Sequence, residues 1–145
     1  MSVGLWWLLS GFIASFGMLR SGTLVVEVSN VEEPAGMVWV GLYDAPDHFL
    51  DKEKALLKGV RIQARGTLSV SLRELPFGRY AVAVFHDRNN NGVLDQNFLG
   101  IPKEPFAFSR PTPSRWRLPR FEEVAFTFGE EKQVLHTALK PWRKH

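Results

Sequence analysis

Oxygen-bearing side chains recur at regular spacing in the stretch that begins at Asp87. Counted from that residue, the first, third, fifth, sixth and ninth positions match the pattern of a calcium-binding loop. Hard cations prefer oxygen ligands, and a glycine at the sixth position allows the positive φ with which the chain turns around an ion. The spacing therefore predicts a calcium site. Its residues are Asp87, Asn89, Asn91, Gly92 and Asp95, with the backbone carbonyl of Val93 at the seventh position.

The twelfth position of this loop departs from the pattern. A bidentate Glu is expected there, and this chain has Phe98, so Glu104 or water would have to complete the coordination. Because only Asp87 and Asp95 carry charge, we expect weak binding, with a dissociation constant of about 10⁻⁴ to 10⁻³ M. The alternative is a metal-free turn, since Asn and Gly tolerate turn conformations without an ion.

Catalytic signatures are absent from the sequence. His86 and Asp87 are neighbours on a predicted strand, so their side chains point to opposite faces and do not converge. His48 lies near Asp47 and Asp51 in a segment that we expect to be a solvated crossover. No nucleophile elbow, HExxH motif or glycine-rich phosphate loop occurs. We therefore predict no catalytic residue and no enzymatic activity.

A proline-rich stretch after the loop combines aromatic and basic side chains. Residues 98–123 contain five prolines, which lack backbone donors and argue against regular sheet. Aromatic and arginine side chains on a loop are typical of binding surfaces. The alternative is that the rings fold back and cap the open end of the fold. The predicted binding residues are Phe106, Phe108, Arg110 and Trp116.

The elements that position these residues show a period of two. Apolar and polar residues alternate in 23–29, 60–72 and 124–139, whereas residues 37–43 are apolar on both faces, as in a central strand. Residues 79–86 form the strand that delivers the candidate calcium loop to the end of a sheet. Many short strands without a long helix predict an all-β fold, an antiparallel seven-stranded sandwich of two sheets.

Two connections are predicted to be hairpins. Gly66 separates two alternating segments within residues 60–72, and Gly129 does so within residues 124–139. A glycine between two alternating segments is a usual sign of paired neighbouring strands. Residues 44–58 break the alternation and are expected to form a crossover with one or two helical turns.

Composition is typical of one globular domain. The chain has 145 residues, of which 45% are hydrophobic and 23% charged, and its net charge of +3 is too small to predict a nucleic-acid partner. It contains no cysteine, which excludes disulfides, thiolate metal sites and a lipid anchor on Cys.

The N-terminal segment predicts export. Residues 3–19 carry no charge, and the first charged side chain is Arg20. As a helix this segment would span about 25 Å, short of the ~30 Å hydrocarbon core of a membrane, which favours a cleaved signal peptide. An uncleaved anchor, which would be the chain's contact with a membrane, and a buried strand or helix are the alternatives. The predicted organisation is a signal peptide or anchor in 1–21, a β-sandwich domain in 22–140 and a basic tail in 141–145.

The stretch LPFGRYAVAVFHDRNNNGVLDQNFLGIPKEPFAFS, residues 75–109, resembles a bacterial family known as domain of unknown function 2141. That family's pattern is close to LPxGxYAxxxxHDxNxNGxxDxNxxGxPxExxGFSN, and RFEEVAF downstream is similar to its FxxAxF stretch. Two positions differ, because Ala107 replaces a glycine and Arg110 an asparagine. The resemblance implies an exported β-sandwich of the prealbumin-like or immunoglobulin-like kind, and it brings no known activity. The D-x-N-x-N-G-x-x-D run is also similar to the calcium loops in the B repeats of Gram-positive surface adhesins.

Two functions are compatible with these observations. The first is an exported module of the periplasm or cell envelope, in which calcium rigidifies the loop and a nearby face binds polysaccharide, anionic lipid or protein. The second is a hydrolase or small-ligand carrier with its site in residues 86–121. An enzyme needs polar groups that converge in a concave pocket at the loop, whereas a calcium-stiffened binding face does not.

Overall fold

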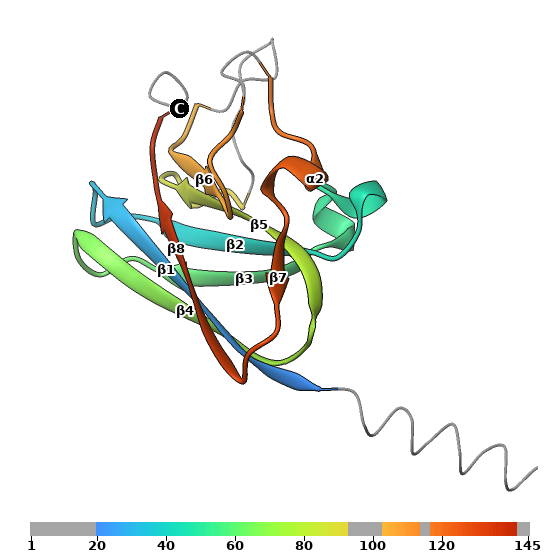
Figure 1. The fold of residues 1–145 in the computed structure, drawn as a ribbon. Helices are drawn as coiled ribbons and strands as arrows, with labels where there is room; N and C mark the ends of the chain where they lie inside the picture. The colour runs from blue at the N-terminus through green and yellow to red at the C-terminus, as the bar shows by residue number, and fades with distance from the viewer. Residues whose placement is uncertain (1–19, 93–102, 114–116, 142–145) are drawn as a thin grey trace, which may run out of the picture.

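The described part of the chain folds into two facing β-sheets. The computed structural model describes residues 20–92, 103–113 and 117–141, and all of its strands belong to these sheets (Figure 1). Residues 1–19 of the predicted signal peptide or anchor lie outside the described residues, and Ser21, which that prediction includes, is the first residue of β1. Within the described part, no helix has the length and apolar character that crossing a membrane requires.

The first sheet has three strands in the order β4-β1-β8. They are β1 (Ser21–Val31), β4 (Gly66–Pro76) and β8 (Lys132–Ala138). In Figure 1, β1 runs between β4 and β8. β1 pairs antiparallel with β4 and parallel with β8.

The second sheet has five strands. Four follow the order β3-β2-β5-β6, and β7 pairs with the first residues of β5. The strands are β2 (Met37–Tyr43), β3 (Leu56–Arg61), β5 (Gly78–Asp87), β6 (Phe106–Phe108) and β7 (Phe126–Phe128). Three short helical segments accompany this sheet: η1 (Pro46–His48), η2 (Lys52–Lys54) and α2 (Phe121–Val124).

The main core lies between the two sheets. The alternation seen in the sequence places every second side chain of β1 there, and Leu24, Val26 and Val28 are fully buried. From β5, Val82 and Val84 join the same cluster, as the strand pattern predicts. Burying such side chains contributes about 1.5–3 kcal/mol each, so this layer is the chief source of stability.

A second buried cluster covers the opposite face of the β3-β2-β5-β6 sheet, which we call the outer face. Tyr43, Phe106 and Phe108 of the sheet pack there with Phe121 and other side chains from the region of α2. Phe49, next to η1, meets the Tyr43 ring edge-on at 5.4 Å between ring centroids. The strand β5 and the end of β2 are therefore covered on both faces, which is why β2 and β5 read as nearly continuous apolar runs.

The two predicted hairpins are wrong. β3 pairs with β2 while β4 pairs with β1, so residues 62–65 carry the chain from one sheet to the other. β7 likewise pairs with β5, and β8 with β1. Alternation shows which face of a strand is buried and does not identify its partner, because both sheets send apolar side chains into one core.

Part of the proline-rich stretch forms a strand, contrary to expectation. Phe106–Phe108 is β6, an edge strand that pairs antiparallel with β5. Pro105 precedes this strand, and its carbonyl accepts a hydrogen bond from the His86 amide at 2.9 Å. Proline is compatible with that position, because only its carbonyl takes part in the ladder.

The predicted all-β fold with two sheets is confirmed. The described residues form eight strands rather than seven. The parallel pairing of β1 with β8 also means that the sandwich is not wholly antiparallel. The crossover predicted for residues 44–58 contains η1 and η2, and its last residues already belong to β3.

Candidate functional site

Asp87 ends β5 on the outer face of its sheet. Alternate residues of a strand point to the same side, so Asp87 shares this side with Phe85 and Ala83. On the neighbouring strand β2, Met37 pairs with Asp87 and Trp39 pairs with Phe85. This register brings the Trp39 indole to the carboxylate, and its Nε1 donates a hydrogen bond to Oδ2 of Asp87 at 3.1 Å.

The Asp87 carboxylate is fully buried and closes the loop that follows it. Its exposed fraction is 0%. The backbone N–H of Asn91 donates to Oδ1 at 3.1 Å, and the backbone N–H of Gly92 donates to Oδ2 at 2.7 Å. The ion pairs found in the described part of the chain do not include Asp87. A buried negative charge is thus balanced by three N–H donors and by no cationic side chain of that part.

Two glycines shape this loop. Gly92 has a φ of 76°, which confirms the positive-φ turn predicted for it. Gly36, before β2, has the same φ of 76°, and a Cβ there would overlap the carbonyl oxygen of Asp87. Glycine at position 36 therefore lets the backbone before β2 touch the backbone at the end of β5.

Glu104 lies at the same loop. The pairing of β6 with β5 returns the chain to the end of β5, and the Arg88 amide donates to Oε2 of Glu104 at 2.7 Å. The exposed fraction of Glu104 is 6%. The carboxylates of Asp87 and Glu104, both largely buried, thus accept hydrogen bonds from backbone N–H groups of the same loop.

The predicted calcium ligands are divided between the described and the undescribed parts of the loop. Asp87, Asn89 and Asn91 lie within the described residues, and Val93 and Asp95 lie outside them. Among the described residues, no group of three or more His, Cys, Asp or Glu side chains is arranged to hold a metal ion. Asp87 and Glu104 are buried acidic side chains that bond to the loop, and the exposed Glu33 lies 3.7 Å from Arg88.

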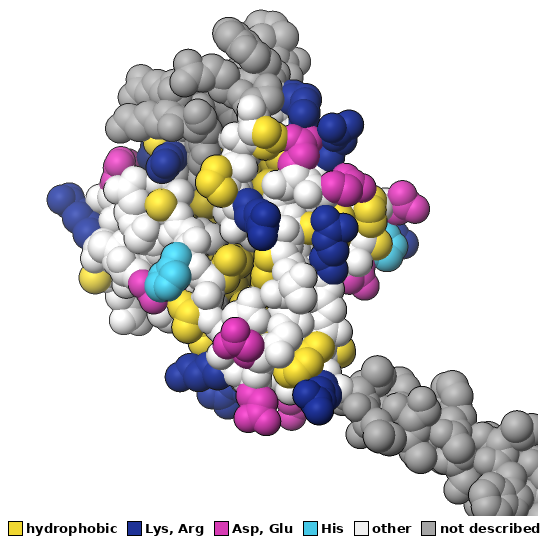
Figure 2. Space-filling view, in the orientation of Figure 1, with side chains coloured by type: hydrophobic (Ala, Val, Ile, Leu, Met, Phe, Trp, Pro, Cys, Tyr) yellow, Lys and Arg dark blue, Asp and Glu magenta, His cyan; other side chains and the backbone are white. Residues whose placement is uncertain are grey.

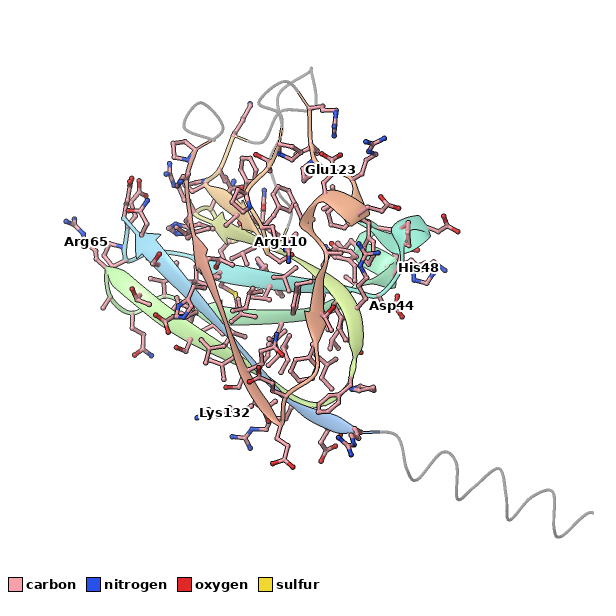
Figure 3. All side chains as sticks on the ribbon, viewed as in Figure 1. Asp44, His48, Arg65, Arg110, Glu123 and Lys132 are labelled. Atoms are coloured by element: carbon pink, nitrogen blue, oxygen red, sulfur yellow. The ribbon has the colours of Figure 1, made fainter. Side chains whose placement is uncertain are left out.

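The histidines considered in the sequence have structural partners. His86 is buried, and its Nε2 lies 2.7 Å from the Ala35 carbonyl oxygen, so it hydrogen-bonds at the end of the sheet. His48 and Asp44 lie side by side at η1 (Figure 3), with 2.9 Å between Nδ1 and Oδ1. Both side chains of that pair are well exposed.

The four predicted binding residues do not form one exposed surface. Phe106 and Phe108 are buried, with exposed fractions of 2% and 8%, and Trp116 lies outside the described residues. Arg110, labelled in Figure 3, is exposed and borders a separate hollow that also touches β8. Ala107 packs into the main core, so the side chain that replaces the family's glycine has a packing role.

A pocket of about 480 Å³ opens on the outer face beside the Asp87 loop. Rings of Trp39, Tyr43, Phe85, Phe106 and Phe108 line it, together with Gly92 of the loop and Lys52 of η2. The Lys52 ammonium donates to the Gly92 carbonyl at 3.0 Å and so ties η2 to the loop. Trp39 and Gly92 contact Asp87 and also line the pocket, which makes the loop one wall of the pocket.

No direct sign of this pocket is visible in the sequence. Trp39, Gly41 and Tyr43 belong to a run that is apolar at every position, and such a run predicts burial on both faces without showing a hollow. The pairing of Gly41 with Ala83 creates the hollow. The pocket could be inferred only once the strand register was known, because the register shows that the small residues Gly41 and Ala83 lie side by side.

An ion pair links the segment before α2 to the third residue of that helix. Arg117 donates to both carboxylate oxygens of Glu123, at 2.8 and 3.2 Å, and the Arg120 amide donates to Oε1 at 3.2 Å. The hydrogen bond from Arg117, followed by the bonds from Arg120, lowers the pKa of Glu123 from 4.5 to about 2. Elsewhere on the face drawn in Figure 2, positive and negative side chains are interspersed.

Comparison with known proteins identifies the family and no activity. Residues 26–136 match the bacterial family described as "Uncharacterized protein conserved in bacteria (DUF2141)". A search of curated proteins and a search of solved structures each found no match. The matched range covers most of β1 to β8 and includes the Asp87 loop and the residues of the outer-face pocket. The chain therefore belongs to the bacterial family of domain of unknown function 2141.

Proposed function

We propose that this protein is an exported binding module of the bacterial cell envelope, in which Ca²⁺ held at Asp87 stabilises one wall of the outer-face pocket. The observation that carries the proposal is the Asp87 carboxylate, which is completely buried without a cationic side chain of the described part beside it. Export is supported by the uncharged residues 3–19.

The energetics of Asp87 favour a cation. A buried carboxylate is costly unless it is paired or fully hydrogen-bonded. An ionised carboxylate has about four acceptor positions, and the three donors that the described residues supply to Asp87 leave one of them on Oδ1. Glu104 adds a second carboxylate at the same loop. The alternative is a metal-free turn held by the same three hydrogen bonds, and calcium binding distinguishes the two.

The pocket favours binding over catalysis. Its lining among the described residues is mainly aromatic and aliphatic, and its polar side-chain groups are the Lys52 ammonium, the Tyr43 hydroxyl and the Trp39 indole N–H. The last of these already donates to Asp87. A hydrolase would need a nucleophile or activated water beside an acid–base group. A small-ligand carrier fits this lining better, because carrier sites are predominantly apolar with few polar groups.

Calcium titration tests the metal part of the proposal. We expect one Ca²⁺ to bind with a dissociation constant of about 10⁻⁴ to 10⁻³ M. At ten times that concentration the native state gains about 1.4 kcal/mol, which raises Tm by roughly 5 °C. Isothermal calorimetry and thermal unfolding measure the two effects. An unchanged Tm together with no heat of binding would leave the loop as a plain turn.

Three variants locate the ion. Asp87→Asn keeps the shape of the side chain and removes its charge, so we expect the calcium-induced shift in Tm to disappear while the protein still folds. Glu104→Gln should weaken calcium binding if Glu104 is the missing ligand. Asp44→Asn is the matched control, because Asp44 is an exposed carboxylate bonded to His48, and it should leave the shift intact.

Export has its own test. Mass spectrometry of the protein from its host should find a new N-terminus between Met18 and Gly22. Recovery of the intact chain from the soluble cytoplasm would contradict this part of the proposal and leave the calcium and pocket parts standing.

A further inference from the structure

The outer-face pocket has the dimensions of a small-molecule site. Its volume of about 480 Å³ falls within the roughly 300–1,000 Å³ typical of such sites. It is formed by four strands of one sheet and by residues of the loops and short helices that follow them, including Lys52, Gly92 and Leu118. The strands supply a rigid base, so the pocket exists without a ligand.

Strand register explains the shape of the pocket. One row across the sheet carries large rings, because Trp39 pairs with Phe85 and Phe85 pairs with Phe106. The next row is low in its centre, where Gly41 pairs with Ala83. Leu57 and Phe108 flank this small pair as the partners of Gly41 and Ala83 on the outer strands. The low centre between taller side chains forms a channel that is apolar on its floor and both sides.

Two polar groups reach this channel. Lys52 is the charged side chain among the described lining residues. Its Nζ donates to the Gly92 carbonyl and forms no ion pair with the described part of the chain. An ammonium group has three donors, so two are left for a ligand.

The Tyr43 hydroxyl is the second polar group. It lies over Gly41, 3.1 Å from where a Cβ would stand there. Burial, and then the negative charge of Asp51, raises the pKa of Tyr43, so the phenol keeps its proton at neutral pH and can donate a hydrogen bond. The pocket therefore offers a ligand one positive charge, at Lys52, and one neutral donor, at Tyr43.

We propose that this pocket binds a free single-chain amphiphile with a carboxylate head, whose alkyl chain lies against the apolar lining and whose carboxylate meets Lys52. This inference rests on the proposed binding role and specifies the ligand. The apolar walls match an alkyl chain, whereas a sugar or nucleotide would leave its hydroxyl groups without hydrogen-bond partners there. The charge of Lys52 selects an acid over the corresponding alcohol.

Displacement of a fluorescent dye tests the ligand class. The purified protein is titrated with 1-anilinonaphthalene-8-sulfonate, and the bound dye is then displaced by laurate or by dodecanol below the concentrations at which they aggregate. Because a charge-assisted hydrogen bond contributes roughly 1.5–3 kcal/mol, we expect laurate to displace the dye at least tenfold more effectively than dodecanol. Equal displacement by the acid and the alcohol would overturn the ligand class and leave the binding role intact.

Matched variants assign the effect to particular residues. Lys52→Gln should abolish the preference for laurate and leave displacement by dodecanol nearly unchanged. Lys54→Gln is the control, because Lys54 belongs to the same short helix η2 and does not line the pocket, and it should behave as the wild type. A Lys52→Gln protein that still prefers laurate would overturn the proposal.

Filling the channel provides the second test. In Gly41→Val the added side chain would occupy its floor, where Oη and Cε2 of Tyr43 and Cδ2 of Leu57 lie 3.1–3.4 Å from the position of the new Cβ and have to move. We expect loss of laurate binding in a protein that still unfolds cooperatively, with a lower Tm than the wild type. Failure of the wild-type protein to bind either dye or laurate would overturn both the ligand class and the binding role of the pocket. Binding to fatty-acid-free anionic lipid vesicles, but not to laurate, would assign the face to a membrane surface and also overturn the proposal.

Discussion

The two faces of the β3-β2-β5-β6 sheet are built from different kinds of residue. On β2, the inner face carries Val38, Val40 and Leu42, all of which are buried in the main core. The outer face of the same strand carries Trp39, Gly41 and Tyr43, which line the pocket. Branched aliphatic side chains of similar size fill space evenly, as close packing requires, whereas large rings next to glycine leave a hollow. One strand thus provides stability on one side and a candidate binding site on the other.

The largest expected effect is a difference in the free energy of unfolding between substitutions on the two faces. Leu42→Ala removes a side chain that is only 4% exposed and should lower the free energy of unfolding by about 2–5 kcal/mol. Leu57→Ala, on the outer face, removes a partly exposed side chain and should cost about 1 kcal/mol. Urea unfolding measures both values. Dye binding should respond in the opposite way, with Leu57→Ala changing the affinity and Leu42→Ala leaving it unchanged in the folded protein.

Equal costs for these two variants would break the comparison. The outer cluster would then contribute to folding as much as the core between the sheets does, and the pocket would be a packing feature of a second core. A change of dye affinity in Leu42→Ala alone would point the same way.

A smaller effect comes from the two glycines at the Asp87 loop. Gly36 and Gly92 have the same positive φ, and alanine in that conformation costs about 1–2 kcal/mol. Nothing lies within 4 Å of a Cβ at Gly92, whereas a Cβ at Gly36 would overlap backbone of Asp87 and Arg88. We therefore expect Gly92→Ala to lose only the conformational cost and Gly36→Ala to lose more, about 3 kcal/mol in total.

This pair sharpens the comparison because it isolates a backbone contact. Gly36→Ala should also weaken calcium binding, since the overlap must move either the start of β2 or the end of β5. Equal destabilisation by the two substitutions would show that the contact between Gly36 and Asp87 has no energetic weight.

Much of the fold could be predicted from the sequence because its signals are local. The period of two in β1 and the uninterrupted apolar run of β2 follow from which faces are buried, and the glycine at position 92 follows from the turn chemistry of a D-x-N-x-N-G run. The partner of each strand is not local information. The sequence therefore predicted hairpins at Gly66 and Gly129 where the chain changes sheets.

The candidate site also combines residues that local sequence could predict with residues that depend on strand pairing. Asp87 and Glu104 were selected from side-chain chemistry, and the structure places both at one loop. The pocket depends on Gly41 lying beside Ala83, residues far apart in the chain whose types suggest no chemistry. The predicted binding role of Phe106 and Phe108 rests on aromatic and basic side chains in one long loop, whereas β6 carries both rings into the outer cluster, where they line the pocket.

The smallest expected effect concerns the ion pair between Arg117 and Glu123 of α2. The pKa of Glu123 is lowered to about 2, chiefly by the hydrogen bond from Arg117. A carboxyl whose pKa is lower in the folded state stabilises the protein above its unfolded pKa of about 4.5, and that contribution is lost as the pH falls toward 2. Arg117→Gln should therefore raise the pKa of Glu123 toward its ordinary value, measurable by NMR titration of the carboxyl carbon.

Arg110→Gln is the control for this titration, because Arg110 is exposed and forms no ion pair with the described residues. Glu123 in the Arg110→Gln variant should titrate as in the wild type. The ion pair lies at the surface, so we expect little change in overall stability from Arg117→Gln. Because α2 carries Phe121 into the outer cluster, dye binding should change more than the urea midpoint does. A shifted urea midpoint with unchanged dye binding in Arg117→Gln would show that α2 supports the fold as a whole rather than the pocket. The outer face near α2 would then contribute to stability as the inner face does, and the contrast between the two faces would not hold there.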